Sequence, residues 1–102
     1  MINSFITAKM PELNNIFNHH QVKSVHLFGS ALTDSFNESS DVDLLVDMGN
    51  ESDPVKKGES MWSLYYDLRK LLKREVDIVT KDSLVNKYFI EELNSTSIAI
   101  YG

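Results

Sequence analysis

Asp41 and Asp43 stand two residues apart in a largely apolar run, DVDLLVDM, at residues 41–48. The run predicts a strand, and alternate residues of a strand project from the same face, so Asp41 and Asp43 lie side by side. Two like charges this close repel each other, and each loses hydration if it is partly buried. A divalent cation resolves the conflict, because Mg²⁺ is commonly bound by one or two carboxylates together with substrate phosphates. The alternative is that both side chains face water at a strand edge.

A third carboxylate has a similar setting. Asp77 stands among apolar, β-branched residues in another predicted strand, EVDIVT. If the two strands are neighbours, three carboxylates converge, which suits two metal ions about 3.5–4 Å apart. Such a pair of ions stabilises both the attacking and the leaving oxygen in phosphoryl transfer.

The pair Gly29-Ser30 directly follows the first predicted strand. Glycine lets the backbone come close to a ligand, a free N–H there binds phosphate oxygens, and the Ser30 hydroxyl adds a hydrogen bond. A Gly-Ser pair alone is a weak signal, because most such pairs are plain turns. Its value lies in the spacing, since ten residues, Ala31 to Ser40, separate Ser30 from Asp41.

The elements that must position these residues follow from the hydrophobic periodicity. Strands are predicted at residues 22–28, 41–48 and 75–80. Helices are predicted at residues 2–19, 61–72 and 83–93. Pro11 predicts either a break near Met10 or a main helix from Pro11 to His19. Residues 31–40 are expected to form a loop or short helical turn, residues 49–58 a flexible connection, and residues 97–101 a strand or a helical turn.

Length and composition restrict the class of protein. The chain has 102 residues, so we expect one α+β (α/β) domain over residues 1–102, with a small mixed sheet of three to four strands and flanking helices. A net charge of −5 argues against a broad basic face for long nucleic acids. The absence of cysteine excludes disulfides and Cys-based zinc sites. Neither a membrane-spanning run nor a signal peptide is evident, so a cytoplasmic protein is expected.

The segment LFGSALTDSFNESSDVDLLV, with its Gly-Ser-x10-Asp-x-Asp spacing, resembles the signature of the minimal nucleotidyltransferases of the DNA polymerase beta superfamily. EVDIVTKDSL resembles the third strand of that family. The resemblance implies the minimal nucleotidyltransferase fold and transfer of a nucleotide, usually AMP from ATP, with release of pyrophosphate. It implies that Asp41 and Asp43 bind Mg²⁺ (two ions, with Mn²⁺ as a substitute), that Asp77 completes the metal site near the nucleophile, and that Gly29 and Ser30 hold the β- and γ-phosphates. A catalytic-base role for Asp77 is consistent with its position.

The resemblance also implies a protein partner, because small proteins of this kind are paired with HEPN-type toxins and modify a hydroxyl of the toxin as antitoxins. One departure bears on activity: Thr33 and Asp34 stand where family members commonly have Arg-Gly. A lost arginine removes a strong phosphate partner. Lys56 and Lys57 are candidates for replacement charge, or are simply solvated.

Two interpretations therefore remain. The first is an active, metal-dependent adenylyltransferase that acts on a hydroxyl of a partner. The second is a degenerate module that binds a nucleotide or a partner without turnover. The aromatic residues Trp62, Tyr65 and Tyr66, which share one predicted helix, either pack into the core or form a partner surface, and a homo-oligomer is also compatible with the sequence.

Overall fold

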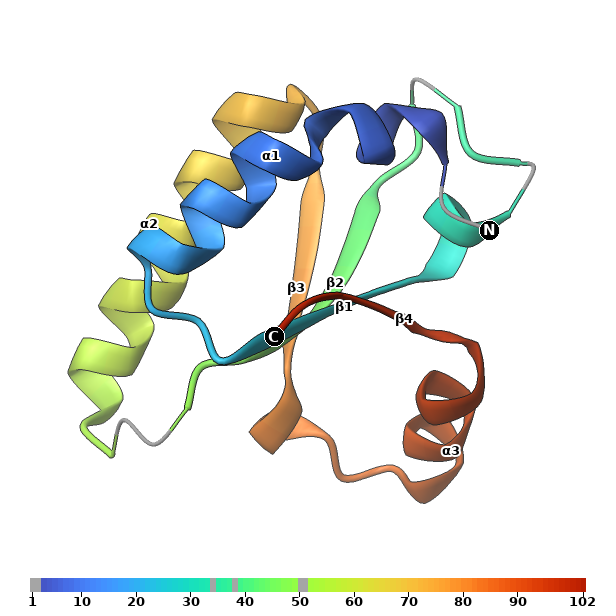
Figure 1. Ribbon diagram of the computed structural model, residues 1–102. Coiled ribbons are helices and arrows are strands. Elements are labelled where there is room, and N and C mark those ends of the chain that lie inside the picture. The colour runs from blue at the N-terminus through green and yellow to red at the C-terminus, as the bar shows by residue number, and fades with distance from the viewer. Residues whose placement is uncertain (1–2, 34, 38, 50–51) are drawn as a thin grey trace.

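A four-stranded mixed sheet carries two helices on one face and a third helix on the other side (Figure 1). The structure is a computed structural model and describes residues 3–33, 35–37, 39–49 and 52–102. The strand order is β3-β2-β1-β4. The strands are β1 (Ser24–Phe28), β2 (Val42–Asp47), β3 (Val76–Thr80) and β4 (Ile98–Tyr101). β1 is antiparallel to β2 and β4, whereas β2 and β3 are parallel, so the predicted α+β class with a small mixed sheet is confirmed.

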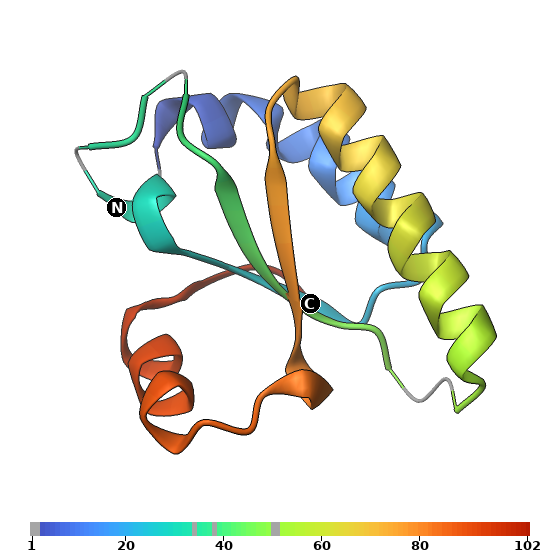
Figure 2. The same cartoon turned by 180° about the vertical axis from the view of Figure 1, so that it is seen from behind.

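The main core lies between the sheet and the two longer helices, α1 (Ser4–His19) and α2 (Pro54–Leu72), which run side by side in both views (Figures 1 and 2). Each helix contributes an apolar stripe at helical spacing. The sheet contributes alternate residues of its strands, as the period of two requires. The fully buried members of this core are Ile6, Leu13, Phe17, Val25, Leu27, Val42, Leu44, Val46, Leu64 and Leu68.

Both alternatives predicted from Pro11, a break near Met10 and a main helix that begins at Pro11, are wrong, because α1 runs without interruption from Ser4 to His19. Proline removes one backbone hydrogen bond from a helix interior. Here Ile6 and Leu13 are buried on either side of it, and their packing against the sheet holds both halves of α1 in line.

The connection before α2 is shorter than predicted. Asp53 caps the helix by accepting a hydrogen bond from the Val55 N–H, and Pro54 occupies the first turn, where a missing N–H costs nothing. Gly58 is therefore helical rather than part of a flexible loop, and both Lys56 and Lys57 lie on a helix.

On the opposite face of the sheet, α3 (Lys87–Thr96) begins four residues later than the predicted helix at residue 83. A short 3₁₀ turn, Lys81–Ser83, takes up the start of that segment, and Asn86 then caps α3 through the Phe89 N–H. Residues 98–101 form β4 and pair with β1, so the strand alternative for this segment is correct. None of the helices in the described part of the chain is long and apolar enough to cross a membrane.

Candidate active site

The sheet register brings Asp43, Asp77 and the end of β1 to one place. Phe28 of β1 pairs with Asp43 of β2, and Asp43 pairs in turn with Asp77 of β3. Paired residues of neighbouring strands project from the same face. Asp43 therefore stands in the middle, with Asp77 on one side and the end of β1, where Gly29 follows, on the other. The buried Val42 and Leu44 face the helices, so these carboxylates lie on the face away from α1 and α2.

Gly29 is at a position where no other residue fits. Its φ is +75°, a backbone conformation that L side chains rarely adopt. A Cβ placed on it would collide with a carboxylate oxygen of Asp43. The Asp43 carboxylate thus lies directly against the Gly29 backbone. Ser30 is held in the 3₁₀ turn Gly29–Leu32, and its hydroxyl donates a long hydrogen bond of 3.4 Å to the Asp41 carbonyl.

The electrostatics of Asp43 reflect this crowding. Burial is the main factor that raises the pKa of Asp43 above its usual value, and the negative charges of Asp77 and Asp41 raise it further. Asp43 is half-buried, whereas Asp41 and Asp77 are exposed. The three carboxylates therefore repel one another, and an added cation would reduce this repulsion.

The donor set of this cluster suits Mg²⁺, because carboxylate oxygens are the hard ligands that this ion takes. Because Gly29 has no side chain, the Asp43 carboxylate occupies the space beside it. The carboxylate therefore lies next to the backbone that is proposed to bind phosphate. As the side chains stand, no group of three or more acidic, histidine or cysteine residues in the described part of the chain is arranged to hold a metal ion. The metal site therefore stays a prediction.

At the position of the usual arginine, Thr33 closes the turn instead. Its hydroxyl bonds to the Ser30 carbonyl at 2.8 Å and to the Ser35 hydroxyl at 2.7 Å. It therefore fixes the backbone of the Gly-Ser turn but brings no positive charge. Asp34, the other departure, lies outside the described residues.

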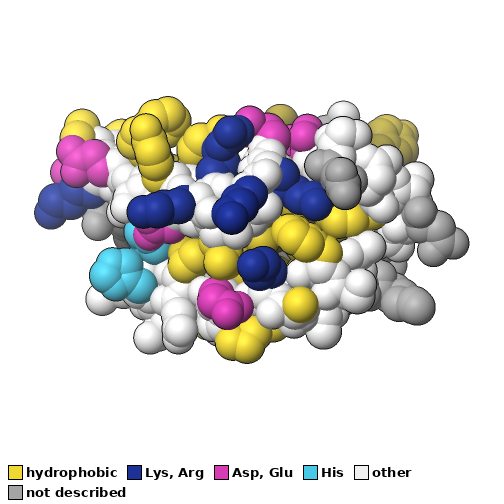
Figure 3. All heavy atoms as spheres, turned by 90° about the horizontal axis from the view of Figure 1, so that it is seen from above, with side chains coloured by type: hydrophobic (Ala, Val, Ile, Leu, Met, Phe, Trp, Pro, Cys, Tyr) yellow, Lys and Arg dark blue, Asp and Glu magenta, His cyan; other side chains and the backbone are white. Residues whose placement is uncertain are grey.

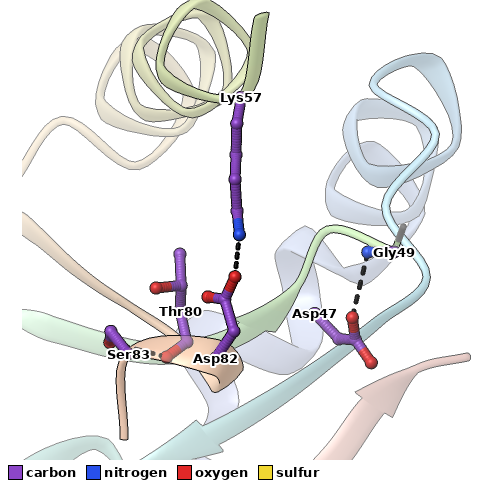
Figure 4. Close-up of polar contacts among 6 residues, drawn as sticks. All are labelled: Asp47, Gly49, Lys57, Thr80, Asp82 and Ser83. Carbon is purple, nitrogen blue, oxygen red and sulfur yellow. Dashed lines mark hydrogen bonds and ion pairs between the residues drawn. The ribbon is translucent and has the colours of Figure 1, made fainter. Parts of the chain in front are cut away.

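The lysines predicted as candidates for replacement charge do not fill that role. Lys57 forms an ion pair with Asp82, beyond the end of β3 that is farther from Asp77 (Figure 4). Lys56 is exposed on α2. Since α2 lies over the face opposite the carboxylates, neither lysine is placed to neutralise a triphosphate at Gly29.

Arg74 is a residue of this region that the sequence patterns did not reveal. Its guanidinium lies between the rings of Phe5 and Phe36, 4.4 and 4.6 Å from their centroids. It also donates hydrogen bonds to the carbonyls of Asn37 and Ser40 at 2.8 and 3.0 Å. Arg74 thereby fastens the loop that leads into Asp41 to the start of the strand that bears Asp77.

The aromatic residues of α2 do not fill the core. Trp62 and Tyr66 are each 63% exposed, and Tyr65 is half-buried. Trp62 stacks on Tyr65 with ring centroids 5.6 Å apart, and the Tyr65 hydroxyl donates to Glu75 at 2.6 Å. Viewed from above, Lys and Arg side chains lie among hydrophobic side chains on the helix layer (Figure 3). Asp and Glu side chains lie on the same face, so this layer is a mixed surface of charged and hydrophobic side chains.

Two hollows flank the row of carboxylates. The first, of about 650 Å³, lies between the end of β1 and α3 and is lined by Gly29, Thr33, Phe28 and Phe89 among others. The second, of about 370 Å³, lies between α2 and β3; Trp62, Tyr65 and Asp77 are among its lining residues.

Comparison with known proteins shows the family to which the chain belongs. The sequence model of the nucleotidyltransferase domain family matches residues 10–100. The chain belongs to this family. Two provisionally named protein adenylyltransferases of Methanocaldococcus jannaschii resemble this nucleotidyltransferase domain. One is 35% identical over 68 residues, which is 64% of this chain and 66% of the relative. The other is 33% identical over 81 residues, 79% of each chain.

Solved structures share the fold of this nucleotidyltransferase domain. A structure provisionally described as a minimal nucleotidyltransferase is 26% identical, with a TM-score of 0.75 over 96% of this chain and 95% of the other. The complex of an AMPylated Shewanella oneidensis HEPN toxin with its MNT antitoxin gives a TM-score of 0.66 at 17% identity, covering 94% and 71% of the two chains. A toxin–antitoxin structure with AMP-PNP gives 0.71 at 19% identity, covering 91% and 73%. The resemblance to minimal nucleotidyltransferases is therefore confirmed.

Proposed function

We propose that this nucleotidyltransferase domain transfers AMP from ATP to a hydroxyl group on a protein partner, with Mg²⁺ as cofactor. The observation that carries the proposal is the register that pairs Asp43 with Asp77 and places Gly29 on the other side of Asp43. In that order a turn that would bind phosphate, a carboxylate that would bind metal and a further carboxylate follow one another in a row. Phosphoryl transfer needs these three parts next to each other.

Each residue has a distinct task in this scheme. The backbone at Gly29 and the Ser30 hydroxyl would hold the β- and γ-phosphates, since glycine admits a close approach. Asp41 and Asp43 would hold the metal ions, and Asp77 would complete the site. Bound Mg²⁺ would supply positive charge for the α-phosphate and the leaving pyrophosphate. Asp77, which is exposed, would take the proton of the acceptor hydroxyl.

The acceptor is proposed to be a protein for two reasons. The curated relatives are named as protein adenylyltransferases, and one of the similar structures is a complex with an AMPylated toxin. In addition, the exposed Trp62 and Tyr66 offer the kind of aromatic surface that is enriched at protein–protein hot spots. A role as antitoxin towards a HEPN-type toxin is the form of this proposal that the similar structures favour.

The test is mass spectrometry of the proteins that co-purify with the tagged chain, after incubation with ATP and Mg²⁺. The expected result is a partner that carries added AMP. Asp77→Ala should abolish the modification while the partner is retained. Asp82→Ala is the matched control, because this exposed aspartate lies beyond the other end of β3 and pairs with Lys57, so its variant should remain active.

A second function, partner binding without turnover, is favoured by two observations. Thr33 replaces the usual arginine with an uncharged side chain, and the carboxylates do not stand as a finished metal-binding group among the described residues. A wild-type chain that retains and neutralises its partner without modifying it would establish this second function in place of the first.

A further inference from the structure

We propose that Arg74 is a positioning residue, which sets the metal affinity of the site by holding Asp41 in place. This inference rests on the proposed nucleotidyl transfer and adds a residue that acts on its metal site. Asp41 needs such support because, unlike Asp43 and Asp77, it lies outside the strands: β2 begins only at Val42. The hydrogen-bond ladder of the sheet does not fix Asp41 by itself, so its place depends on the contacts of its neighbours.

Two hydrogen bonds hold the backbone on either side of Asp41. Before it, the Arg74 guanidinium donates a hydrogen bond to the Ser40 carbonyl at 3.0 Å. After it, the Glu75 carbonyl accepts a hydrogen bond from the Val42 N–H at 3.0 Å. Both partners belong to the segment that directly precedes β3. The position of Asp41 is therefore set relative to β3, the strand that bears the third carboxylate.

The loop before Asp41 is tied into one unit, which Arg74 holds at two points. The Asn37 carbonyl accepts a hydrogen bond from the Ser40 N–H at 3.1 Å, and the Ser40 hydroxyl accepts one from the Asn37 N–H at 3.0 Å. Arg74 donates to this same Asn37 carbonyl at 2.8 Å, in addition to the Ser40 carbonyl. Loss of Arg74 would release Asn37 and Ser40 together, and Asp41 follows them directly in the chain.

The Arg74 guanidinium is itself held in place. It lies 4.4 Å from the ring centroid of Phe5, at the start of α1, and 4.6 Å from that of Phe36, in the loop. A planar guanidinium that is already fixed loses little conformational entropy when it donates hydrogen bonds. Lysine would keep a positive charge between the rings but lacks the planar fork of donors, so the two side chains are not equivalent here.

A further bond to Asp41 comes from the Gly-Ser turn but is weaker. The Ser30 hydroxyl donates to the Asp41 carbonyl at 3.4 Å, which is long for such a bond, whereas the bonds from Arg74 and to Glu75 have ordinary lengths. The segment before β3 therefore contributes more to the placement of Asp41 than Ser30 does. The Ser30 hydroxyl can turn to a phosphate oxygen without releasing Asp41.

The experiment measures binding of Mn²⁺, as a probe for Mg²⁺, to the complete chain by electron paramagnetic resonance with a non-hydrolysable ATP analogue present. This readout does not depend on turnover. Loss of a residue that orients a metal ligand typically weakens metal binding about 10–100-fold. Arg74→Met keeps an aliphatic stem between the rings but removes the donors, so it should raise the Kd for Mn²⁺ roughly tenfold. Arg74→Lys should recover part of this loss.

A double variant tests whether Arg74 acts through Asp41. Asp41→Asn removes a charge from the proposed metal site and should weaken Mn²⁺ binding by itself. Residues that act as a unit are not additive, so Arg74→Met should weaken binding much less in the Asp41→Asn background than in wild type.

Two control variants separate this role from charge and from general stability. Arg69→Met makes the same substitution at an arginine that pairs with the Glu75 side chain and not with the loop. Val22→Ala removes buried volume next to the end of β1 that pairs with Asp47, far from Phe28 and the site, and should lower Tm. Both variants should leave the Kd for Mn²⁺ unchanged.

An unchanged Kd in Arg74→Met would overturn the positioning role, and so would an equal loss in Val22→Ala. A loss from Arg74→Met that is as large in the Asp41→Asn background as in wild type would also overturn it. A wild-type chain that binds no Mn²⁺ with the analogue would overturn the proposed function and the positioning role together. A wild-type chain that binds Mn²⁺ but transfers no AMP to its partner would overturn the proposed function alone.

Discussion

The substitution Asp43→Asn tests how strongly the carboxylates of Asp41, Asp43 and Asp77 repel one another. Residues paired across neighbouring strands lie about 5 Å apart, and two unit charges at that distance repel by about 0.8 kcal/mol in water and about 3 kcal/mol at an effective dielectric of 20. Because Asp41 and Asp77 are exposed, the lower value applies. Asp43→Asn should therefore stabilise the metal-free protein by about 1 kcal/mol, which raises Tm by roughly 4–8 °C for a domain of this size.

The pH dependence of this gain has a definite sign. A carboxyl whose pKa is raised on folding contributes stability that is present at acid pH, below its unfolded pKa, and is lost as the pH rises through the folded value. The advantage of Asp43→Asn over wild type should therefore be full at pH 7 and shrink towards pH 4. Mg²⁺ at ten times its Kd should stabilise wild type by about 1.4 kcal/mol and the variant by less.

The assay is thermal unfolding followed by circular dichroism, with and without Mg²⁺, at several pH values. Asp47→Asn serves as control, because Asp47 lies on the same strand and face and accepts a hydrogen bond from the Gly49 N–H that asparagine can also accept (Figure 4). If Asp43→Asn is no more stable than Asp47→Asn at pH 7, or if its advantage does not change with pH, the repulsion argument is refuted.

Two further substitutions test the backbone and the loop that surround the site. Gly29→Ala should destabilise the fold and abolish nucleotide binding, because the φ of residue 29 is +75° and the added Cβ meets the Asp43 carboxylate. Gly58→Ala is the control: its added Cβ meets nothing within 4 Å, so it should raise the free energy of unfolding in urea by about 0.5–1 kcal/mol. Arg74→Ala should cost about 2–3 kcal/mol through lost ring contacts and two carbonyls left without their donor. Arg69→Ala, which removes an exposed ion pair, should cost much less by the same assay. A smaller loss for Arg74→Ala than for Arg69→Ala would contradict the role given to Arg74.

Local patterns were sufficient to predict the strands and the order of elements. Short apolar runs with β-branched residues are distinctive, and alternation predicted that Asp41 and Asp43 share one face. Asp43 lies in β2, whereas Asp41 directly precedes this strand, so the shared face stays a prediction. The residues alone did not predict that the strand of Asp77 pairs with the strand of Asp43, because strand pairing depends on contacts between residues far apart in sequence. The resemblance to nucleotidyltransferases made the pairing an expectation, and the register confirms it.

The errors have different physical causes. The sequence contains a signal for the early start of α2, since Asp53 is a helix cap and Pro54 follows it in the first turn. Gly58 was instead interpreted as part of a flexible connection. The continuity of α1 could not be predicted from the sequence, because it depends on the burial of residues on both sides of Pro11, which outweighs one lost hydrogen bond. Arg74 gives no local signal either, because its partners Phe5 and Phe36 are distant in sequence and meet it only in the folded molecule.

Folding of this chain completes one side of the sheet last. β1 pairs with β4 through contacts such as His26 with Ala99, whereas every candidate site residue lies in the stretch that ends with β3. Contacts between distant residues pay a larger loop-closure entropy and form late. During synthesis the carboxylate row can therefore assemble while β1 still has an unpaired edge, and an unpaired edge is where a strand of another chain adds. We therefore expect the yield of folded protein to depend on how soon α3 and β4 pack onto the sheet, although neither bears a candidate catalytic group.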